Sequence, residues 1–140
     1  MADYGDIPSF PSAQYKFITL RDVNDAIAHN ILNICLDYGV DMVLPLHEFE
    51  INPIAKSTVL FQEFNIQVLL PELTDILKYF YPQQDIQPGL TWYYFLDGAL
   101  QFPQNAPERI LELGKEKGLN GVFYIPDDPD GLTGILFTIP

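Results

Sequence analysis

The sequence is poor in basic residues. It holds 7 lysines and arginines against 19 aspartates and glutamates, which gives a formal net charge of −12. A chain with this excess of negative charge repels the phosphate backbone of nucleic acid and an anionic membrane surface. We therefore expect neither as a partner. The acids are scattered along the chain, which favours a generally soluble surface over a mimic of nucleic acid or a dedicated acidic face.

Cysteine is almost absent, because Cys35 is the only one. No disulfide and no redox thiol pair can form, as is typical of a protein in a reducing compartment. A single nucleophilic cysteine would need a neighbouring histidine, and only His29 and His47 are present. Since Cys35 falls on the apolar side of a predicted helix, we predict a buried structural thiol.

Long apolar runs are also missing. No run approaches the roughly 18 residues of a membrane span, and the N-terminal stretch MADYGDIPSF has neither a basic start nor an apolar segment. We therefore expect a cytoplasmic protein.

Catalytic and metal-binding motifs are missing as well. None of the three serines, Ser9, Ser12 and Ser57, lies in a G-x-S-x-G turn, and neither a P-loop nor a G-x-G-x-x-G fingerprint occurs. Three aspartates beside a glycine resemble a calcium loop in composition, but a proline takes the first ligand position and no glutamate closes the loop, so an ordinary polar turn is favoured; these residues are Pro126, Asp127, Asp128, Asp130 and Gly131. We predict no catalytic residue, no cofactor and no metal.

The 140 residues suit one domain, and the first half alternates strand-like and helix-like segments. Proline after asparagine predicts a helix start at Asn52-Pro53, and glycine at position 39 predicts a helix stop. The predicted order is strand 16–20, helix 22–38, strand 40–46, helix 52–65 and strand 66–70. Such alternation implies right-handed crossovers, so the predicted fold class is α/β, with a partial doubly wound parallel sheet over residues 16–71.

The second half predicts an α+β portion with two hairpins. A short helix over 71–80, with Leu73, Ile76, Leu77 and Phe80 facing inward, leads into a turn-rich connector over 81–89. This connector gives the only plausible subdivision, into 1–84 and 85–140. The pair Asp97-Gly98 predicts a tight hairpin. A helix is predicted over 107–117, with caps at Asn105 and Gly118. The strands GVFYIP and GILFTIP, on either side of DDPDGLTG, are predicted to form a second pair.

The segment TWYYFL is apolar on both faces. Alternation turns Trp92, Tyr94 and Leu96 to one side and Tyr93 and Phe95 to the other. A strand of this kind is either central in a sheet or covered by a partner, so a homodimer is one expected arrangement.

His47, Glu48 and Glu50 are the candidate substrate-binding residues. They follow the carboxyl end of a predicted parallel strand, where open α/β sheets gather ligand contacts. The competing interpretation is the solvated start of a loop, with the two glutamates favouring a nearby helix N-terminus.

The first half resembles the N-terminal, pre-ATP-grasp domain of ATP-grasp carboxylate-amine ligases, the group that includes carbamoyl-phosphate synthase large subunits. The resemblance is carried by Ala2-Asp3 as a strand end and by the segments KFITL, ICLDYGVD, MVLPLHEFE, IAKSTVLFQEF and NIQVLLP. It implies a scaffold that supplies part of a substrate cleft. The family's first strand, its glycine-rich turn, and the lysine and metal ligands that hold the nucleotide are not matched here, and TWYYF is a candidate to fill the place of the missing strand.

The resemblance therefore implies a non-catalytic scaffold that is inactive without an ATP-grasp partner region or remainder. The alternative is an acidic interaction module, of the immunity or inhibitor type, that binds a basic partner.

Overall fold

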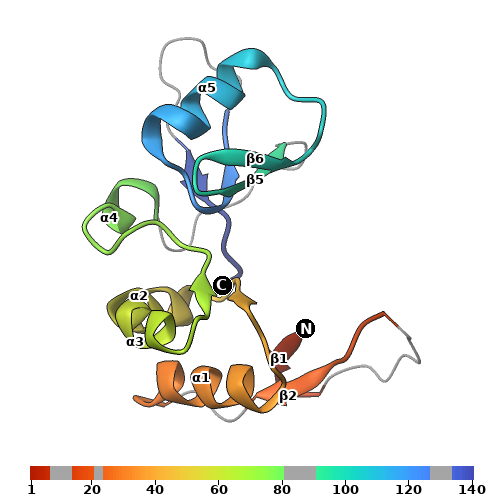
Figure 1. Cartoon of the computed structure of the whole chain (residues 1–140), viewed down its shortest axis with the longest axis vertical. Helices are drawn as coiled ribbons and strands as arrows, with labels where there is room; N and C mark the ends of the chain where they lie inside the picture. The colour runs from red at the N-terminus through yellow and green to blue at the C-terminus, as the bar shows by residue number, and fades with distance from the viewer. Residues whose placement is uncertain (7–13, 21–23, 81–90, 127–133) are drawn as a thin grey trace.

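The computed structural model describes residues 1–6, 14–20, 24–80, 91–126 and 134–140, and these form a mixed α/β protein (Figure 1). The elements in chain order are β1 (Ala2–Tyr4), β2 (Ile18–Leu20), α1 (Ile27–Asp37), β3 (Met42–Val43), α2 (Glu48–Lys56), α3 (Thr58–Glu63), β4 (Gln67–Val68), α4 (Ile76–Tyr79), β5 (Trp92–Leu96), β6 (Ala99–Phe102), α5 (Glu108–Lys117), β7 (Gly121–Tyr124) and β8 (Ile135–Leu136). The mixed class matches the prediction.

The described strands form three small sheets. β1 pairs with β2 and β3 pairs with β4, both in parallel, while β6, β5, β7 and β8 form an antiparallel sheet in that order. The parallel direction agrees with the expectation for residues 16–71, but the described strands of this range do not form one sheet. β2 pairs with β1, which precedes the range, and β3 pairs with β4.

The aromatic strand does not fill a gap in the parallel part of the fold, contrary to our expectation. β5 lies between β6 and β7 in the antiparallel sheet. The reason is local: Asp97 and Gly98 both have positive φ, 47° and 82°, so the chain reverses at once and β5 pairs with β6. The predicted hairpin is confirmed, and so is the pairing of β7 with β8.

α2 begins earlier than predicted. Its first residue is Glu48, its N-cap is His47, and Pro53 lies inside the helix instead of starting it. Glu50, at the third helical position, accepts hydrogen bonds from the backbone N–H groups of Leu46 and His47, which stabilises the earlier start. Asn65, with φ 58°, follows the end of α3 as expected.

The other helices agree with the sequence in part. Gly39 and Gly118 have positive φ and follow the ends of α1 and α5, as predicted. The N-cap of α5 is Pro107 and not Asn105. α4 is only four residues long. Ile76 and Phe80 are buried as predicted, whereas Leu73, which precedes α4, and Leu77 are exposed.

Several predicted features lie outside the described residues. These are the beginning of the first helix at residues 22–23, the connector 81–89, and the aspartate loop with Asp127, Asp128 and Asp130. Among the described helices, none combines the length and the apolar character that a membrane span requires.

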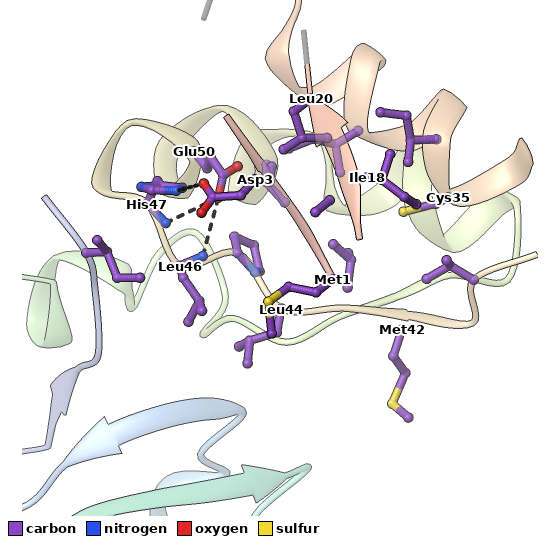
Figure 2. A pocket seen from close by; sticks show the side chains of 18 residues that line it. Met1, Asp3, Ile18, Leu20, Cys35, Met42, Leu44, Leu46, His47 and Glu50 are labelled. Atoms are coloured by element: carbon purple, nitrogen blue, oxygen red, sulfur yellow. Dashed lines mark hydrogen bonds and ion pairs between the residues drawn. The ribbon is translucent and has the colours of Figure 1, made fainter. Parts of the chain in front are cut away.

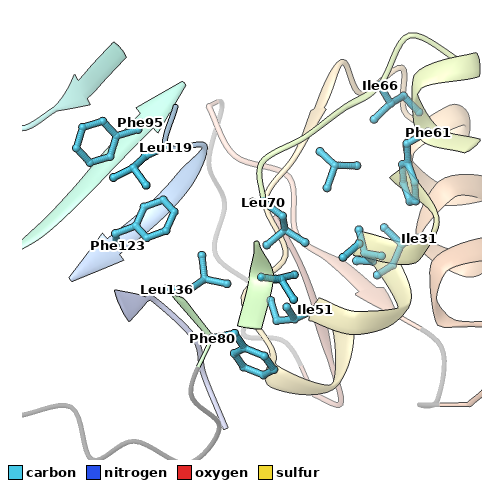
Figure 3. Close-up of a cluster of buried hydrophobic side chains, with 14 of the residues drawn as sticks. Ile31, Ile51, Phe61, Ile66, Leu70, Phe80, Phe95, Leu119, Phe123 and Leu136 are labelled. Carbon is cyan, nitrogen blue, oxygen red and sulfur yellow. The ribbon is translucent and has the colours of Figure 1, made fainter. Parts of the chain in front are cut away.

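One contiguous cluster of buried side chains runs through both halves (Figure 3). Phe61 and Ile51 lie at its centre in the first half, and Phe95 and Phe123 in the second; all four are fully buried. The halves are also joined by the Asn120 side-chain amide, which donates to the backbone carbonyls of two residues of the first half, Val68 (3.0 Å) and Leu70 (3.2 Å). The β3–β4 pair therefore belongs to a core that both halves share, since Val68 is part of it and Val43 packs against it.

Candidate functional site

A cleft of about 470 Å³ opens beside β1 and β3 (Figure 2). Its size falls within the range of small-molecule and peptide pockets. The lining is mainly apolar, and it comes from β1, β2, α1, β3, α2, the segments that adjoin them and the C-terminal Ile139. The lining residues are Met1, Ala2, Asp3, Ile18, Leu20, Ile31, Ile34, Cys35, Val40, Met42, Val43, Leu44, Pro45, Leu46, His47, Glu50, Ile54 and Ile139. The ionisable carboxyl and imidazole groups, Asp3, His47 and Glu50, lie together at one end (Figure 2).

Glu50 is the best-anchored polar group of the cleft. It is buried, and its carboxylate accepts hydrogen bonds from the hydroxyl of Tyr4 (2.8 Å) and from the backbone N–H groups of Leu46 (3.3 Å) and His47 (3.2 Å). Because every contact is with a donor, the buried carboxylate is compensated. Glu50 therefore ties the start of α2 to β1 and fixes the shape of the cleft at this end.

His47 and Asp3 form the second polar contact. The imidazole Nε2 of His47 lies 2.9 Å from the carboxylate of Asp3. This hydrogen bond, together with one from the backbone N–H of Tyr4, holds the pKa of Asp3 below its usual value. The His47 ring stacks on Phe49 at 5.0 Å, and Tyr4 packs edge-on against both rings.

Tyr4 completes this network. Burial, followed by its hydrogen bond to the Glu50 carboxylate, raises the pKa of the phenol well above its usual value, so Tyr4 is protonated and acts as a donor. The polar side chains at this end of the cleft thus bond to one another and to nearby backbone N–H groups.

The structure brings two of the three predicted site residues to the cleft. His47 and Glu50 line it, whereas Glu48 does not and accepts a hydrogen bond from the hydroxyl of Thr138 at 3.5 Å. Asp3 and Tyr4 were missed as site residues. They lie 44 and 46 residues before their partners, and only the placement of β1 brings them there.

Cys35 also lines the cleft, as a buried side chain of α1. Burial raises the pKa of its thiol, which keeps the group protonated and weakly nucleophilic at neutral pH. His29 lies on the exposed face of the same helix, so the helix does not place it as a base for Cys35. The predicted structural thiol agrees with this burial.

We expect Cys35 to react slowly with a water-soluble disulfide reagent in the folded protein. The rate at pH 7 should rise by at least about tenfold in denaturant, because unfolding removes both the burial and the raised pKa. The measurement is the absorbance of the released thiolate over time, with the urea-unfolded chain as the control. Equal rates in the two states would contradict the burial of the thiol.

The remaining chemistry of the cleft is limited. In the described ranges, no group of three or more His, Cys, Asp or Glu side chains is placed to hold a metal ion. The arrangement is suited to binding, with an apolar wall and an acidic end. Comparison with known proteins found no matching family model, curated protein or solved structure.

Proposed function

We propose that this chain is a non-catalytic scaffold of the pre-ATP-grasp type, which supplies one wall of a substrate cleft and works together with an ATP-grasp partner region. The observation that carries the proposal is the cleft itself. It is lined by β1, β2 and β3, which belong to two pairs of parallel strands that do not join into one sheet. A doubly wound half-sheet that lacks a central strand would have this arrangement.

The charges around the cleft support a role in binding without nucleotide chemistry. Among the described residues that line it, none is Lys or Arg, while Asp3 and Glu50 are both acidic. Nucleotide phosphates need cationic side chains, a glycine-rich loop or a magnesium site to offset their charge. The cleft offers an apolar wall, and its acidic end disfavours anions.

We expect no measurable binding of Mg-ATP to this chain alone. The test is calorimetric titration of ATP into the protein with magnesium present, with magnesium alone titrated as the control. Saturable heat at a one-to-one ratio would contradict the proposal, because it would require a nucleotide site that this chain is proposed to lack.

The acidic interaction module stays as the second candidate, favoured by one observation. Glu108, Glu112 and Glu116 are exposed at four-residue spacing along α5. Two lysines of the same helix interrupt this row, and Lys117 pairs with Glu116 at 3.1 Å. A basic protein whose binding is abolished when these three glutamates are replaced by glutamine would favour the module over the scaffold.

A further inference from the structure

Each of the two parallel strand pairs has a strand at the cleft, β1 or β3, whose outer edge has no partner strand among the described residues. The carbonyl of Met1 accepts the N–H of Ile18 in β2. In the other pair, the carbonyls of Asp41 and Val43 accept N–H groups of the β4 segment, at 2.8 and 2.9 Å. Successive residues of a strand direct their backbone groups to opposite edges. The backbone N–H and C=O groups of Ala2 therefore point away from β2. Those of Met42 and Leu44 point away from β4.

Both strand segments line the same cleft. Consecutive residues of both segments, 1–3 and 42–47, line it, as expected where a cavity runs along the edge of a strand (Figure 2). In the described part of the chain, no further strand pairs with β1 or β3. An exposed strand edge carries unmatched donors and acceptors and is a template for another strand.

Apolar side chains are exposed along the same cleft. Met1 is 77% exposed and Met42 47%, and Leu44 and Ile139 are also exposed; all four line the cleft. Exposed apolar side chains gathered at one place mark an interaction surface. The cleft thus combines strand edges that have no partner strand in the described ranges with exposed apolar side chains, and an extended peptide can pair with the first and cover the second.

The edge of β3 already accepts a parallel segment just beyond the strand. Ile139 donates its N–H to the carbonyl of Leu46 at 2.7 Å and accepts the N–H of Glu48 at 3.0 Å, which forms a parallel bridge to His47. By alternation, Leu46 directs its carbonyl to the same edge as Met42 and Leu44. Ile139 therefore occupies this edge at Leu46 and His47, and the preceding residues, Met42 to Leu44, have no partner strand there among the described residues.

We propose that an extended apolar segment of a partner protein adds as a strand in this cleft, parallel to β1 and β3, and joins the two strand pairs into one sheet. This inference rests on the proposed function, because it names what the partner region contributes. Backbone hydrogen bonds on both edges would give affinity, and the apolar lining would select β-branched and other apolar residues.

The acidic end of the cleft sets the charge of the segment. A parallel strand would direct its carboxyl end toward the exposed carboxylate of Asp3, where a lysine or arginine is favoured and an acidic residue is repelled. A second copy of this chain is a poorer occupant, since two copies with a net charge of −12 each repel one another.

The test begins with a display library of random ten-residue peptides selected on the wild-type protein. We expect enriched peptides with at least about four consecutive apolar, mainly β-branched residues and a basic residue after them. The best sequence is then synthesised with a fluorescent label, and its affinity is measured by anisotropy. A second synthesis carries methyl groups on two alternate backbone nitrogens, which removes two donors and leaves every side chain unchanged.

Methylation should weaken binding by about tenfold or more, because two hydrogen bonds are lost. Leu44→Asp should abolish binding, whereas Leu77→Asp, a matched change of an exposed leucine on α4 that does not line the cleft, should leave it unchanged. Circular dichroism of both variants checks folding.

The inference is overturned if no peptide is enriched, if the methylated peptide binds equally well, or if Leu44→Asp binds like the wild type. A wild-type dimer that Leu44→Asp dissociates would also overturn it, because the occupant would then be a second copy. None of these outcomes depends on Mg-ATP binding, so a failure here is distinguishable from a failure of the scaffold proposal.

Discussion

Replacing Gly114 by alanine is expected to destabilise the protein by about 2–4 kcal/mol. Gly114 lies on the buried side of α5, and an added Cβ would overlap the ring of Phe95 and lie 2.9 Å from the carbonyl oxygen of Gly98. Phe95 is fully buried in the centre of the antiparallel sheet, so the ring has no free space into which it could move. Either α5 or β5 must shift to admit the methyl group.

Gly118→Ala is the matched control. Gly118 has φ 58° and no atom within 4 Å of an added Cβ, so this alanine meets only the backbone cost of a left-handed conformation, about 1 kcal/mol. Urea unfolding followed by tryptophan fluorescence measures both variants. If Gly114→Ala is no more destabilising than Gly118→Ala, α5 does not pack against β5 as described.

Glu50→Ala is expected to cost a similar amount, about 2–4 kcal/mol. The change removes the acceptor for the backbone N–H groups of Leu46 and His47 and for the hydroxyl of Tyr4. A buried N–H or O–H group that has lost its acceptor destabilises the folded state by more than the net stability that its hydrogen bond had contributed. We also expect the start of α2 and β1 to loosen, which should appear as faster hydrogen exchange at Glu50 and its neighbours.

Glu50→Gln separates hydrogen bonding from charge. The single amide oxygen can accept from both backbone N–H groups, and the amide nitrogen can donate to the oxygen of Tyr4, so we expect a loss of only about 1 kcal/mol. Both variants are compared with the wild type by urea unfolding at pH 7. A loss as large for glutamine as for alanine would mean that the negative charge, and not the set of accepted hydrogen bonds, is what the fold requires.

Local signals in the sequence were sufficient for the turns and the helix ends. Asp97-Gly98 and the glycines at 39 and 118 each require a backbone conformation that few other residues adopt, and each is found where the sequence predicted it. The same reasoning failed at Asn52-Pro53. Proline is well suited to the first turn of a helix, but the start of α2 depends on the Glu50 side chain, which reaches back to accept the backbone N–H of the N-cap residue, His47.

Half of the polar network was visible in the sequence. His47 and Glu50 follow a predicted strand and could be named, whereas Asp3 and Tyr4 come from a distant strand whose position depends on pairing with β2. No periodicity or spacing connects such residues. The separation of the parallel strands into two pairs could not be predicted either. A strand-like segment in the sequence does not indicate which other strand it will pair with.

The placement of the single tryptophan and the single cysteine gives each half of the molecule its own native reporter. Trp92 is half-exposed on β5 and stacks on Phe102 at 5.0 Å, while Cys35 lines the cleft in the other half. The fluorescence of Trp92 should therefore report on unfolding of the β5–β6 hairpin and should not change when the cleft is filled. The reaction rate of the Cys35 thiol should report on the cleft. The unmodified chain can thus report, without any inserted probe, whether its two halves melt together or in succession.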